Sequence, residues 1–357
     1  MNINIIDARS IFTKTLVDVY RERPAVTSFL RSFFPTVECD TKEVSIQVQR
    51  GTEKVAVDIM RGTEGNRNTF SRSTEKIIVP PYFREYFDAT ELDFYDKLFG
   101  QFNGEINENT FNNWLAAISE KLGVLQDKIE RAYELQCSQV LVDGIVTLVN
   151  GDNIDFKRKV ASKVTVTTKW DNGASDPIGD FITGGTFLRT KGKAQGGVFN
   201  TIFGASAYEA LLNNTSVKER ADIKAYADML SLREPQRNAV GASLVGRLTT
   251  GSFVHNMWVY PEYYTDSNGV DQPYIPAKLV ISVPEQPRFK LAFGAVPMIF
   301  KDPANAALPA FVTNVQAAYV IGNYIDERTE KHIFDIKSAG IAIPTAVDQI
   351  YTMQVLA

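Results

Sequence analysis

The sequence has few of the residues that most often carry enzyme chemistry. Only two histidines and two cysteines occur among its 357 residues. Cys39 and Cys137 lie far apart and in no metal or redox spacing, so we expect two thiols that pack as small apolar side chains. His255 and His332 have apolar and aromatic neighbours, which favours packed or surface residues over ligands or general bases. These absences predict a protein that is not an enzyme and that holds no cofactor or metal.

The motifs of common enzyme classes are missing as well. The sequence contains no His-x-x-x-His, Cys-x-x-Cys or Gly-x-Ser-x-Gly pattern. The glycine-rich run 184–193 does not fit a phosphate-binding loop, because Phe187 stands where glycine is needed and Ala194 where serine or threonine is needed. We interpret this run as a helix end and a loop before a strand. A cytosolic β-rich hydrolase is disfavoured, since no nucleophile accompanies a base.

The chain also lacks a strong charge excess and long apolar runs. Its formal net charge of −4 argues against electrostatic wrapping of nucleic acid, because domains that do so are usually strongly basic. No apolar stretch approaches roughly 18 residues, the length that a membrane-spanning helix needs. The N-terminus lacks the pattern of a signal peptide, so we expect a cytosol-like compartment and no membrane contact. Hydrophobic residues at 44% and charged residues at 22% allow a sizeable core.

The stretch from Val44 to Pro81 predicts a long two-stranded arm. Apolar residues alternate with polar ones in its outgoing part, at Val44, Ile46, Val48, Val55, Val57 and Ile59. Residues 61–73 form a tip with almost nothing apolar, and 77–79 bring the chain back as a strand. Because an isolated hairpin is at best marginally stable in water, we predict that something outside the fold, such as another copy, supplies the missing contacts.

The residues on both sides of this arm are rich in aromatic side chains. Residues 28–35 form a dense apolar patch that docks either on its own domain or on a neighbour. Residues 82–102 mix aromatic and acidic side chains, and we interpret them as a packed connector whose carboxylates face water. A metal or acid–base site there would rest on carboxylates alone, with no histidine nearby.

A long helix is the clearest element of the sequence. From Asn109 to Val140 apolar residues recur every three or four positions, and Gly144 can stop the helix because glycine tolerates the left-handed turn of a helix end. Roughly 30 residues at 1.5 Å each would span about 45 Å. A compact domain seldom needs this length, so we expect the helix to act as a spine.

The rest of the chain alternates short strands with helices. An Asn-Gly turn predicts a hairpin that joins 145–149 to 154–156. A helix is expected to start at Pro177 behind Asp176, because a capping residue and a proline favour a first turn. The other expected elements are strands at 164–168 and 198–203, helices over 206–212 and 216–232, and strands and turns beyond 245 with a hairpin-like turn at 266–269.

This order of elements and several residue groups resemble the lambda-type major capsid protein (major capsid protein E) family of tailed bacteriophages. The matching groups are Phe29–Pro35 with Thr41–Val44, Pro80-Pro81-Tyr82, Trp170-Asp171 with Asp176-Pro177 and Asp180, Ile202-Phe203, and Met353–Ala357. The resemblance covers essentially the whole chain, and the collinear order carries more of it than any single motif.

The resemblance implies an α+β fold, the tailed-phage and herpesvirus type of major capsid fold. Carried onto this chain, the N-terminal arm is 1–40 and the extended β loop is 41–84. The peripheral domain with its long spine helix is 85–155 together with 320–357, and the axial domain is 156–319. The implied function is a structural major capsid protein that self-assembles into the icosahedral head of a tailed bacteriophage. Its implied location is the virion capsid, assembled in the host cytoplasm.

The resemblance also implies partners. They are further copies of the chain as hexamers and pentamers, a separate scaffold, a portal and a decoration protein, and double-stranded DNA that is enclosed without sequence-specific binding. Two alternatives stay open, a nanocompartment shell protein of the same fold and a phage tail-tube subunit. The long helix argues against the tail-tube subunit.

Contacts between subunits are expected where the arm meets a neighbour. Residues 61–76 carry four basic and two acidic side chains, which suits an acidic surface such as 85–96 of an adjoining subunit. Single exposed ion pairs contribute little, but many copies in a closed shell sum to a strong assembly. The candidate contact residues are Phe29, Phe33, Phe34, Arg61, Arg67, Phe70, Arg72, Lys76, Glu85 and Asp88.

Overall fold

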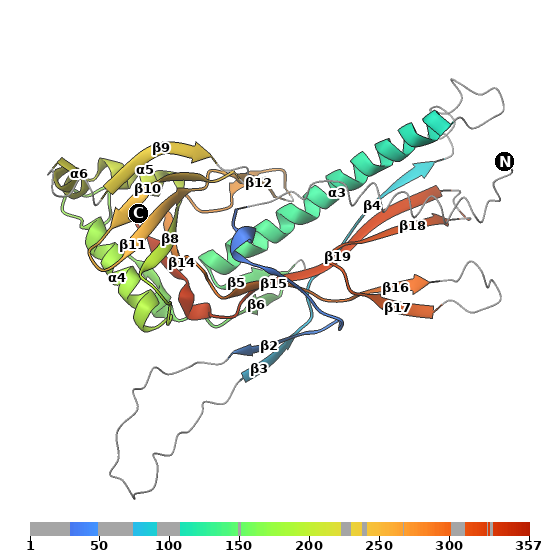
Figure 1. Cartoon of the computed structure of the whole chain (residues 1–357), viewed down its shortest axis with the longest axis horizontal. Helices are drawn as coiled ribbons and strands as arrows, with labels where there is room; N and C mark the ends of the chain where they lie inside the picture. The colour runs from blue at the N-terminus through green and yellow to red at the C-terminus, as the bar shows by residue number, and fades with distance from the viewer. Residues whose placement is uncertain are drawn as a thin grey trace, which may run out of the picture.

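A long helix, α3 (Glu108–Val142), connects two differently built ends of an elongated molecule (Figure 1). A seven-stranded sheet with its helices forms one end, and a five-stranded sheet runs beside α3 toward the other (Figure 1). This computed structural model describes residues 29–48, 74–90, 108–148, 151–222, 230–237, 241–266, 268–300, 311–326, 328 and 331–357.

Helix α3 forms where the sequence predicts it, over 35 residues or about 52 Å. One stripe of the helix is fully buried, at Ile118, Leu122, Ile129, Tyr133, Cys137 and Val140. The helix stops at Gly144, whose φ of +73° lies in the left-handed region. The Gly144 N–H donates to the carbonyl groups of Gln139 and Val140 at 3.2 and 3.0 Å, as in a glycine-terminated helix. The predicted spine and its stop are therefore both confirmed.

The five-stranded sheet is organised around one long strand, β19 (Lys331–Pro344). The first part of β19 pairs antiparallel with β4 (Tyr82–Thr90) on one side and with β18 (Val320–Asp326) on the other. From Gly340 onward it pairs with β15 (Phe289–Phe293), which runs parallel to β1 (Thr36–Glu38). Helix α3 lies against β19, and the hydroxyl groups of Tyr133 and Ser338 lie 2.5 Å apart between them.

Strand β4 corrects the interpretation of residues 82–102 as a connector. Residues 82–90 pair with β19 in continuous register, from Tyr82 opposite Ala339 to Thr90 opposite Lys331. This strand could not be recognised from the sequence, because each of its faces carries both aromatic and charged residues and no apolar–polar alternation is visible. Residues 91–102 lie outside the described residues.

The seven-stranded sheet has an aromatic core and three accompanying helices. Its order is β7 (Lys163–Thr165), β20 (Tyr351–Gln354), β14 (Leu279–Pro284), β8 (Val198–Phe203), β11 (Val254–Val259), β10 (Ser243–Thr249) and β9 (Leu230–Arg237). The helices are α4 (Pro177–Thr190), α5 (Ala205–Asn213) and α6 (Thr215–Asp222). Strand β8 and helices α4 and α5 lie where the sequence predicts them. The C-terminal strand β20 belongs to this sheet.

One helix prediction needs correction and another is confirmed. The polar helix expected over 216–232 is described from Thr215 to Asp222 as α6, whereas residues 230–232 belong to strand β9. The glycine-rich run 184–193 is a helix end and loop as predicted, because residues 184–190 are the last turns of α4 and residues 191–193 lie between α4 and β8. A Cβ atom at Gly184 would lie 2.9 Å from the Tyr351 ring, and one at Gly185 would lie 2.6 Å from the Phe253 ring. These glycines therefore let α4 approach the sheet closely.

Four two-stranded ribbons complete the described part of the chain. They are β2 (Val44–Val48) with β3 (Thr74–Ile78), β5 (Ile145–Thr147) with β6 (Asn153–Asp155), β12 (Tyr263–Thr265) with β13 (Asp271–Pro273), and β16 (Val296–Phe300) with β17 (Phe311–Val315). The β5–β6 ribbon confirms the Asn-Gly hairpin, and β12–β13 confirms the turn at 266–269.

The β2–β3 ribbon confirms the base of the predicted arm and points away from the body of the molecule (Figure 1). Val44 and Ile78, which face each other in the ribbon, are each 5% exposed and pack against Ala292 and Ile341 of the five-stranded sheet. The rest of the predicted arm, residues 49–73, lies outside the described residues. The base of the arm is therefore part of the core.

Candidate assembly surface

Strand β4 separates a packed face from an exposed face of the five-stranded sheet. On the packed face, Phe83 lies edge-on to Tyr133 of α3 with ring centroids 5.3 Å apart. Glu85 pairs with Lys128 of α3 at 2.7 Å on the same face. Phe87 continues this face and stacks on a phenylalanine of β19. Because side chains alternate along a strand, the residues between them project to the opposite side.

The opposite face exposes an unusual number of large aromatic side chains. Tyr82 and Tyr86 of β4 are 50% and 62% exposed, and Tyr324 of β18 is 41% exposed. We call these three tyrosines, together with Arg84, the outer tyrosine surface. Tyrosine combines a large apolar ring with a polar hydroxyl group, which suits contacts with a protein partner. Clustered exposed rings of this kind mark an interaction site more often than scattered ones do.

An ion pair between exposed Arg84 and a buried carboxylate fixes the shape of the outer tyrosine surface. Asp335 of β19 is 0% exposed, and its Oδ2 atom accepts hydrogen bonds from Nε and Nη2 of Arg84 at 2.8 and 2.7 Å. The same Nη2 donates to the Tyr324 hydroxyl group at 2.9 Å, and the Lys337 ammonium lies 3.3 Å from Oδ2. The network holds Arg84 and one tyrosine in place, so a partner would meet a preorganised surface.

The structure places three of the four candidate phenylalanines in the core of their own chain. Phe29, Phe33 and Phe34 are only 4%, 9% and 2% exposed. Phe29 packs against Trp258 and Tyr260 at 5.1 and 5.5 Å between ring centroids. Side chains so deeply buried offer almost no surface to a neighbouring subunit, which disfavours their selection as contacts between subunits. The sequence left open whether this apolar patch packs on its own domain or on a neighbour, and the structure shows that it packs on its own chain.

Buried carboxylates of α3 hold this N-terminal segment. Glu134 is 2% exposed and accepts the backbone N–H groups of Leu30 and Arg31 at 2.9 and 3.0 Å. Its Oε1 atom also accepts the hydroxyl group of Tyr260 at 2.7 Å. One turn earlier on the helix, Glu130 forms an ion pair with Arg31. The segment around the short helix η1 (Arg31–Phe33) is thus fastened to the spine by both charge and hydrogen bonds.

The two acidic candidates already have partners within their own chain. Glu85 pairs with Lys128, and Asp88 pairs with Lys331 of β19 at 2.6 Å. The hydrogen bond from Lys331 holds the pKa of Asp88 below its usual value. The structure does not bring Glu85 and Asp88 together, since they project to opposite faces of β4. Both carboxylates are therefore already paired with a lysine of their own chain, which weakens their attraction for an arginine of a neighbouring copy.

The remaining candidates belong to the arm. Lys76 lies in β3, opposite Ile46 of β2. The other four, Arg61, Arg67, Phe70 and Arg72, lie outside the described residues. The roles of Arg84, Asp335 and Glu134 could not be recognised from the sequence, because their partners lie more than 100 positions away along the chain. The sequence of a strand such as β19 also does not tell which of its polar residues is buried.

The histidines of the chain are packing residues. His255 is 0% exposed on β11, between the rings of Phe181 and Phe199. Its Nδ1 atom lies 3.0 Å from Oγ1 of Thr201, and burial lowers its pKa to about 4. His332 stacks on Phe334 of the same strand with ring centroids 4.2 Å apart. Within the described ranges, no three histidine, cysteine, aspartate or glutamate residues gather as a metal site would require.

Comparisons with known proteins connect this architecture to viral capsids. The family model described as phage major capsid protein E matches residues 12–320. A crystal structure assigned as the capsid protein of a prophage in E. coli CFT073 is 16% identical and has a TM-score of 0.63, over 97% of this chain and 99% of that one. The capsid of a native GTA particle is 12% identical with a TM-score of 0.51, over 94% and 93% of the two chains. Comparison with curated proteins gave no match.

Both structural matches extend over nearly the whole chain, which confirms the capsid fold and its α+β class. Among the described helices, none is long and apolar enough to cross a membrane. The family match is the stronger finding, because it covers well over half of the sequence. This chain therefore belongs to the phage major capsid protein E family.

Proposed function

We propose that the arm of one copy lies on the outer tyrosine surface of a neighbouring copy when the protein builds its shell. As a phage major capsid protein, the chain is a structural subunit of the virion capsid and not an enzyme. The proposal concerns the contacts between its copies. The observation that carries the proposal is the cluster of Tyr82, Tyr86 and Tyr324, each 41–62% exposed in the single subunit.

The charges of the arm suit this tyrosine surface better than the acidic surface expected from the sequence. Arg61, Arg67 and Arg72 belong to the arm tip. Glu85 and Asp88 are already neutralised by lysines of their own chain. Arginine guanidinium groups stack on tyrosine rings and still keep their hydrogen-bond donors. We therefore place the arginines over tyrosine rings rather than opposite carboxylates.

The base of the arm supports a role as a clamp. Val44 and Ile78 bury the start and end of the arm in the five-stranded sheet. A pull on the tip would thus be transmitted to the sheet that also carries the outer tyrosine surface. In a closed shell every subunit would both give an arm and receive one, so weak single contacts would add up.

We further propose the assembly that the sequence implies for this family. The copies form hexamers and pentamers of an icosahedral head that encloses double-stranded DNA, with separate scaffold, portal and decoration proteins. A net charge of −4 fits this role, because a wall that gripped DNA tightly would hinder its entry and exit. A nanocompartment shell and a tail-tube subunit are the alternatives, and the capsid family match favours the head over both.

Electron microscopy of purified protein tests the assembly. Closed polyhedral shells or flat hexameric sheets are the expected products, and a persistent monomer at high concentration would contradict the proposal. Subunits that lack residues 62–73 should assemble poorly or build shells that dissociate more easily. If the deletion leaves assembly and shell stability unchanged, the arm is not the clamp.

A double variant tests the receiving surface. Tyr82→Ser with Tyr86→Ser should leave the fold intact and raise the protein concentration needed for assembly about tenfold or more, since interface tyrosines often contribute over 1 kcal/mol each. Val160→Ser is the matched control, because Val160 is 89% exposed and lies in the short helix η3 (Val160–Ser162), away from β4. Equal assembly of the double variant and the control would exclude this surface.

A further inference from the structure

Within the described residues, the chain passes between the five-stranded sheet with its helix α3 and the seven-stranded sheet at three places. They are the path from α3 through the β5–β6 ribbon to β7, the segment from β14 to β15 and the segment from β19 to β20. Any change in the angle between the sheets must be absorbed by these segments. The residues that tie the segments to one another therefore decide how rigid the joint is.

The first of these crossings begins at the end of α3, where helix carbonyl groups need partners. The turn at Gly144 satisfies the carbonyl groups of Gln139 and Val140. The carbonyl groups of Leu141 and Val142 come next, at the negative end of the helix dipole. A cation with several donors is the group best suited to this position.

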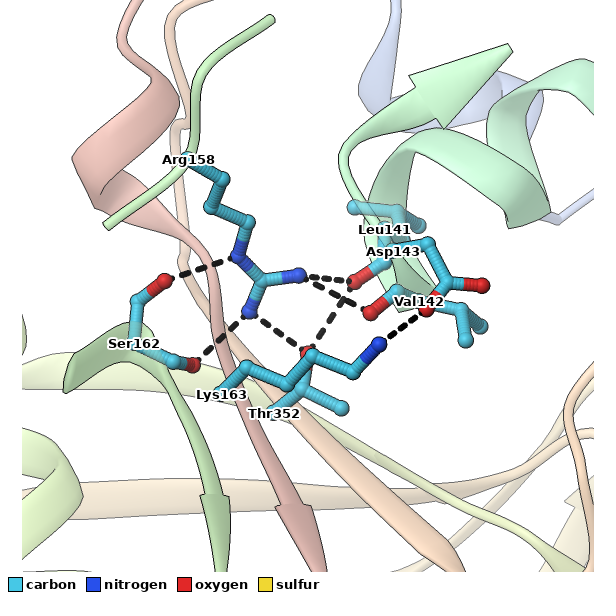
Figure 2. A network of polar contacts seen from close by, with 7 residues as sticks. All are labelled: Leu141, Val142, Asp143, Arg158, Ser162, Lys163 and Thr352. Atoms are coloured by element: carbon cyan, nitrogen blue, oxygen red, sulfur yellow. Dashed lines mark hydrogen bonds and ion pairs between the residues drawn. The ribbon is translucent and has the colours of Figure 1, made fainter. Parts of the chain in front are cut away.

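Arg158 supplies that cation (Figure 2). Its Nη1 atom donates to the carbonyl groups of Leu141 and Val142 at 2.9 and 3.0 Å. Its Nε atom donates to Oγ of Ser162 at 2.9 Å, and Nη2 donates to the Ser162 carbonyl group at 2.8 Å. One side chain thus joins the end of the spine helix to the segment that enters β7.

The same guanidinium group also reaches the third crossing. Its Nη2 atom donates to Oγ1 of Thr352 at 2.7 Å and to the Ile350 carbonyl group at 3.3 Å. The Thr352 hydroxyl group in turn donates to the Leu141 carbonyl group at 3.1 Å, which closes the ring of contacts in Figure 2. Residues 158 and 352 lie 194 positions apart. The contacts therefore fasten the C-terminal strand β20 to α3.

The second crossing is linked to the third by a neighbouring contact. The side-chain carbonyl group of Gln349 accepts the backbone N–H of Arg288 at 3.1 Å, and the Ala346 N–H donates to the Arg288 carbonyl group at 3.1 Å. Gln349 lies in the short helix η4 (Val347–Gln349), directly before the residues that Arg158 holds. All three crossings thus meet in one connected network.

The Arg158 side chain is also closely packed against Gly144. A Cβ atom at Gly144 would lie 3.0 Å from both Cβ and Cδ of Arg158. Glycine at this position therefore serves two purposes. It adopts the left-handed backbone conformation, and it leaves room for the aliphatic part of the Arg158 side chain. Nearby, Lys163 pairs with Asp143, which adds an ion pair between the helix end and β7 (Figure 2).

We propose that Arg158 is the positioning residue that fixes the angle between the two sheets, and with it the curvature of the shell that copies of this chain build. In a shell, an error in this angle repeats in every subunit, so small deviations change the diameter or prevent closure. The proposal rests on shell assembly by this capsid protein and does not depend on where the arm docks.

Arg158→Met tests the proposal, because methionine has a similar length and no donors. The expected result is a folded subunit in which the amide hydrogens of 141–144 and 350–352 exchange about tenfold faster, since local opening becomes easier. Shells of this variant should have a broader or shifted diameter distribution in electron micrographs. Arg158→Lys should recover part of the wild-type distribution, because one ammonium group replaces only part of the planar set of donors.

The matched control is Arg189→Met, since Arg189 is an exposed arginine on α4. It should leave both the exchange rates and the diameters unchanged. Folded Arg158→Met subunits that build shells with the wild-type diameter distribution would overturn the proposal. So would an equal change in the control.

A second variant covers the case in which Arg158→Met does not fold. Thr352→Val keeps the shape of the side chain and removes only the link between β20, Arg158 and the Leu141 carbonyl group. Shifted or broadened diameters at unchanged folding support the proposal, and unchanged diameters contradict it. If even the wild-type protein builds no shells, the assembly proposal is wrong. Small-angle scattering of the single subunits then decides whether Arg158→Met changes the angle between the sheets.

Discussion

Gly322 of β18 leaves room for the carboxylate of Asp335 on the neighbouring strand β19. The two residues face each other in the ladder, and a Cβ atom at position 322 would lie 2.0 Å from the Oδ1 atom of Asp335. The buried carboxylate thus occupies the volume that a side chain would otherwise fill. This arrangement lets Arg84 reach the same carboxylate from the solvent side.

The first prediction concerns this contact. Gly322→Ala should lower the free energy of unfolding by about 1–3 kcal/mol, because the methyl group forces either Asp335 or the strand to move. Thermal and urea unfolding measure the effect. Gly173→Ala is the control, since its Cβ atom would meet only an ordinary contact at 3.7 Å. Equal stability of the two variants would show that β18 adjusts freely.

The second prediction removes the guanidinium group above Asp335. Arg84→Ala should cost about 2–4 kcal/mol of folding stability, somewhat less than a fully unpaired buried charge, because Lys337 stays 3.3 Å from Oδ2. Arg247→Ala, at an exposed arginine of β10, should change stability by less than about 0.5 kcal/mol. A loss no greater than that of the control would mean that Lys337 alone neutralises the carboxylate.

The third prediction concerns the fastening of the N-terminal segment. Glu134→Ala leaves two backbone N–H groups and the Tyr260 hydroxyl group without their acceptor, so we expect a loss of about 3–5 kcal/mol. Limited proteolysis should then cut near residues 29–34 much faster than in the wild-type protein. Glu209→Ala, on the exposed side of α5, serves as the control. An unchanged cleavage rate would exclude Glu134 as the fastening point.

The fourth prediction is a dependence of stability on pH. Burial lowers the pKa of His255 to about 4, below the unfolded value of 6.5. Its contribution is fully present above about pH 6.5 and is lost as the pH falls toward 4, because the unfolded chain takes up a proton that the folded chain refuses. The shift corresponds to about 3 kcal/mol.

Denaturant unfolding at several pH values checks this expectation. In His255→Gln the decline in stability between pH 6.5 and pH 4 should become shallower than in the wild-type protein, although the variant loses stability at neutral pH as well. His332→Gln is the control and should keep the steep decline. Parallel pH profiles of His255→Gln and the wild-type protein would contradict the assignment.

Elements with a strong local pattern could be predicted from the sequence. Helix α3 has its three- and four-residue spacing and its terminal glycine, and the β5–β6 hairpin has its Asn-Gly turn. Strand β4 could not be recognised, because aromatic and charged residues share both of its faces. Strand β9 is polar, and its strand state depends on pairing with β10. The strand conformation of such a segment is explained only by its pairing with the neighbouring strand.

The sequence by itself determined much of the order of elements, the long spine and the base of the arm, since these follow from periodicity and turn residues within short windows. Only the tertiary structure decided which side chains are buried and which are exposed. It buried Phe29, Phe33 and Phe34, exposed Tyr82 and Tyr86, and joined Arg158 to Thr352. The physical reason is that burial and hydrogen bonding depend on segments far away in the chain, and no local pattern records which segments will meet.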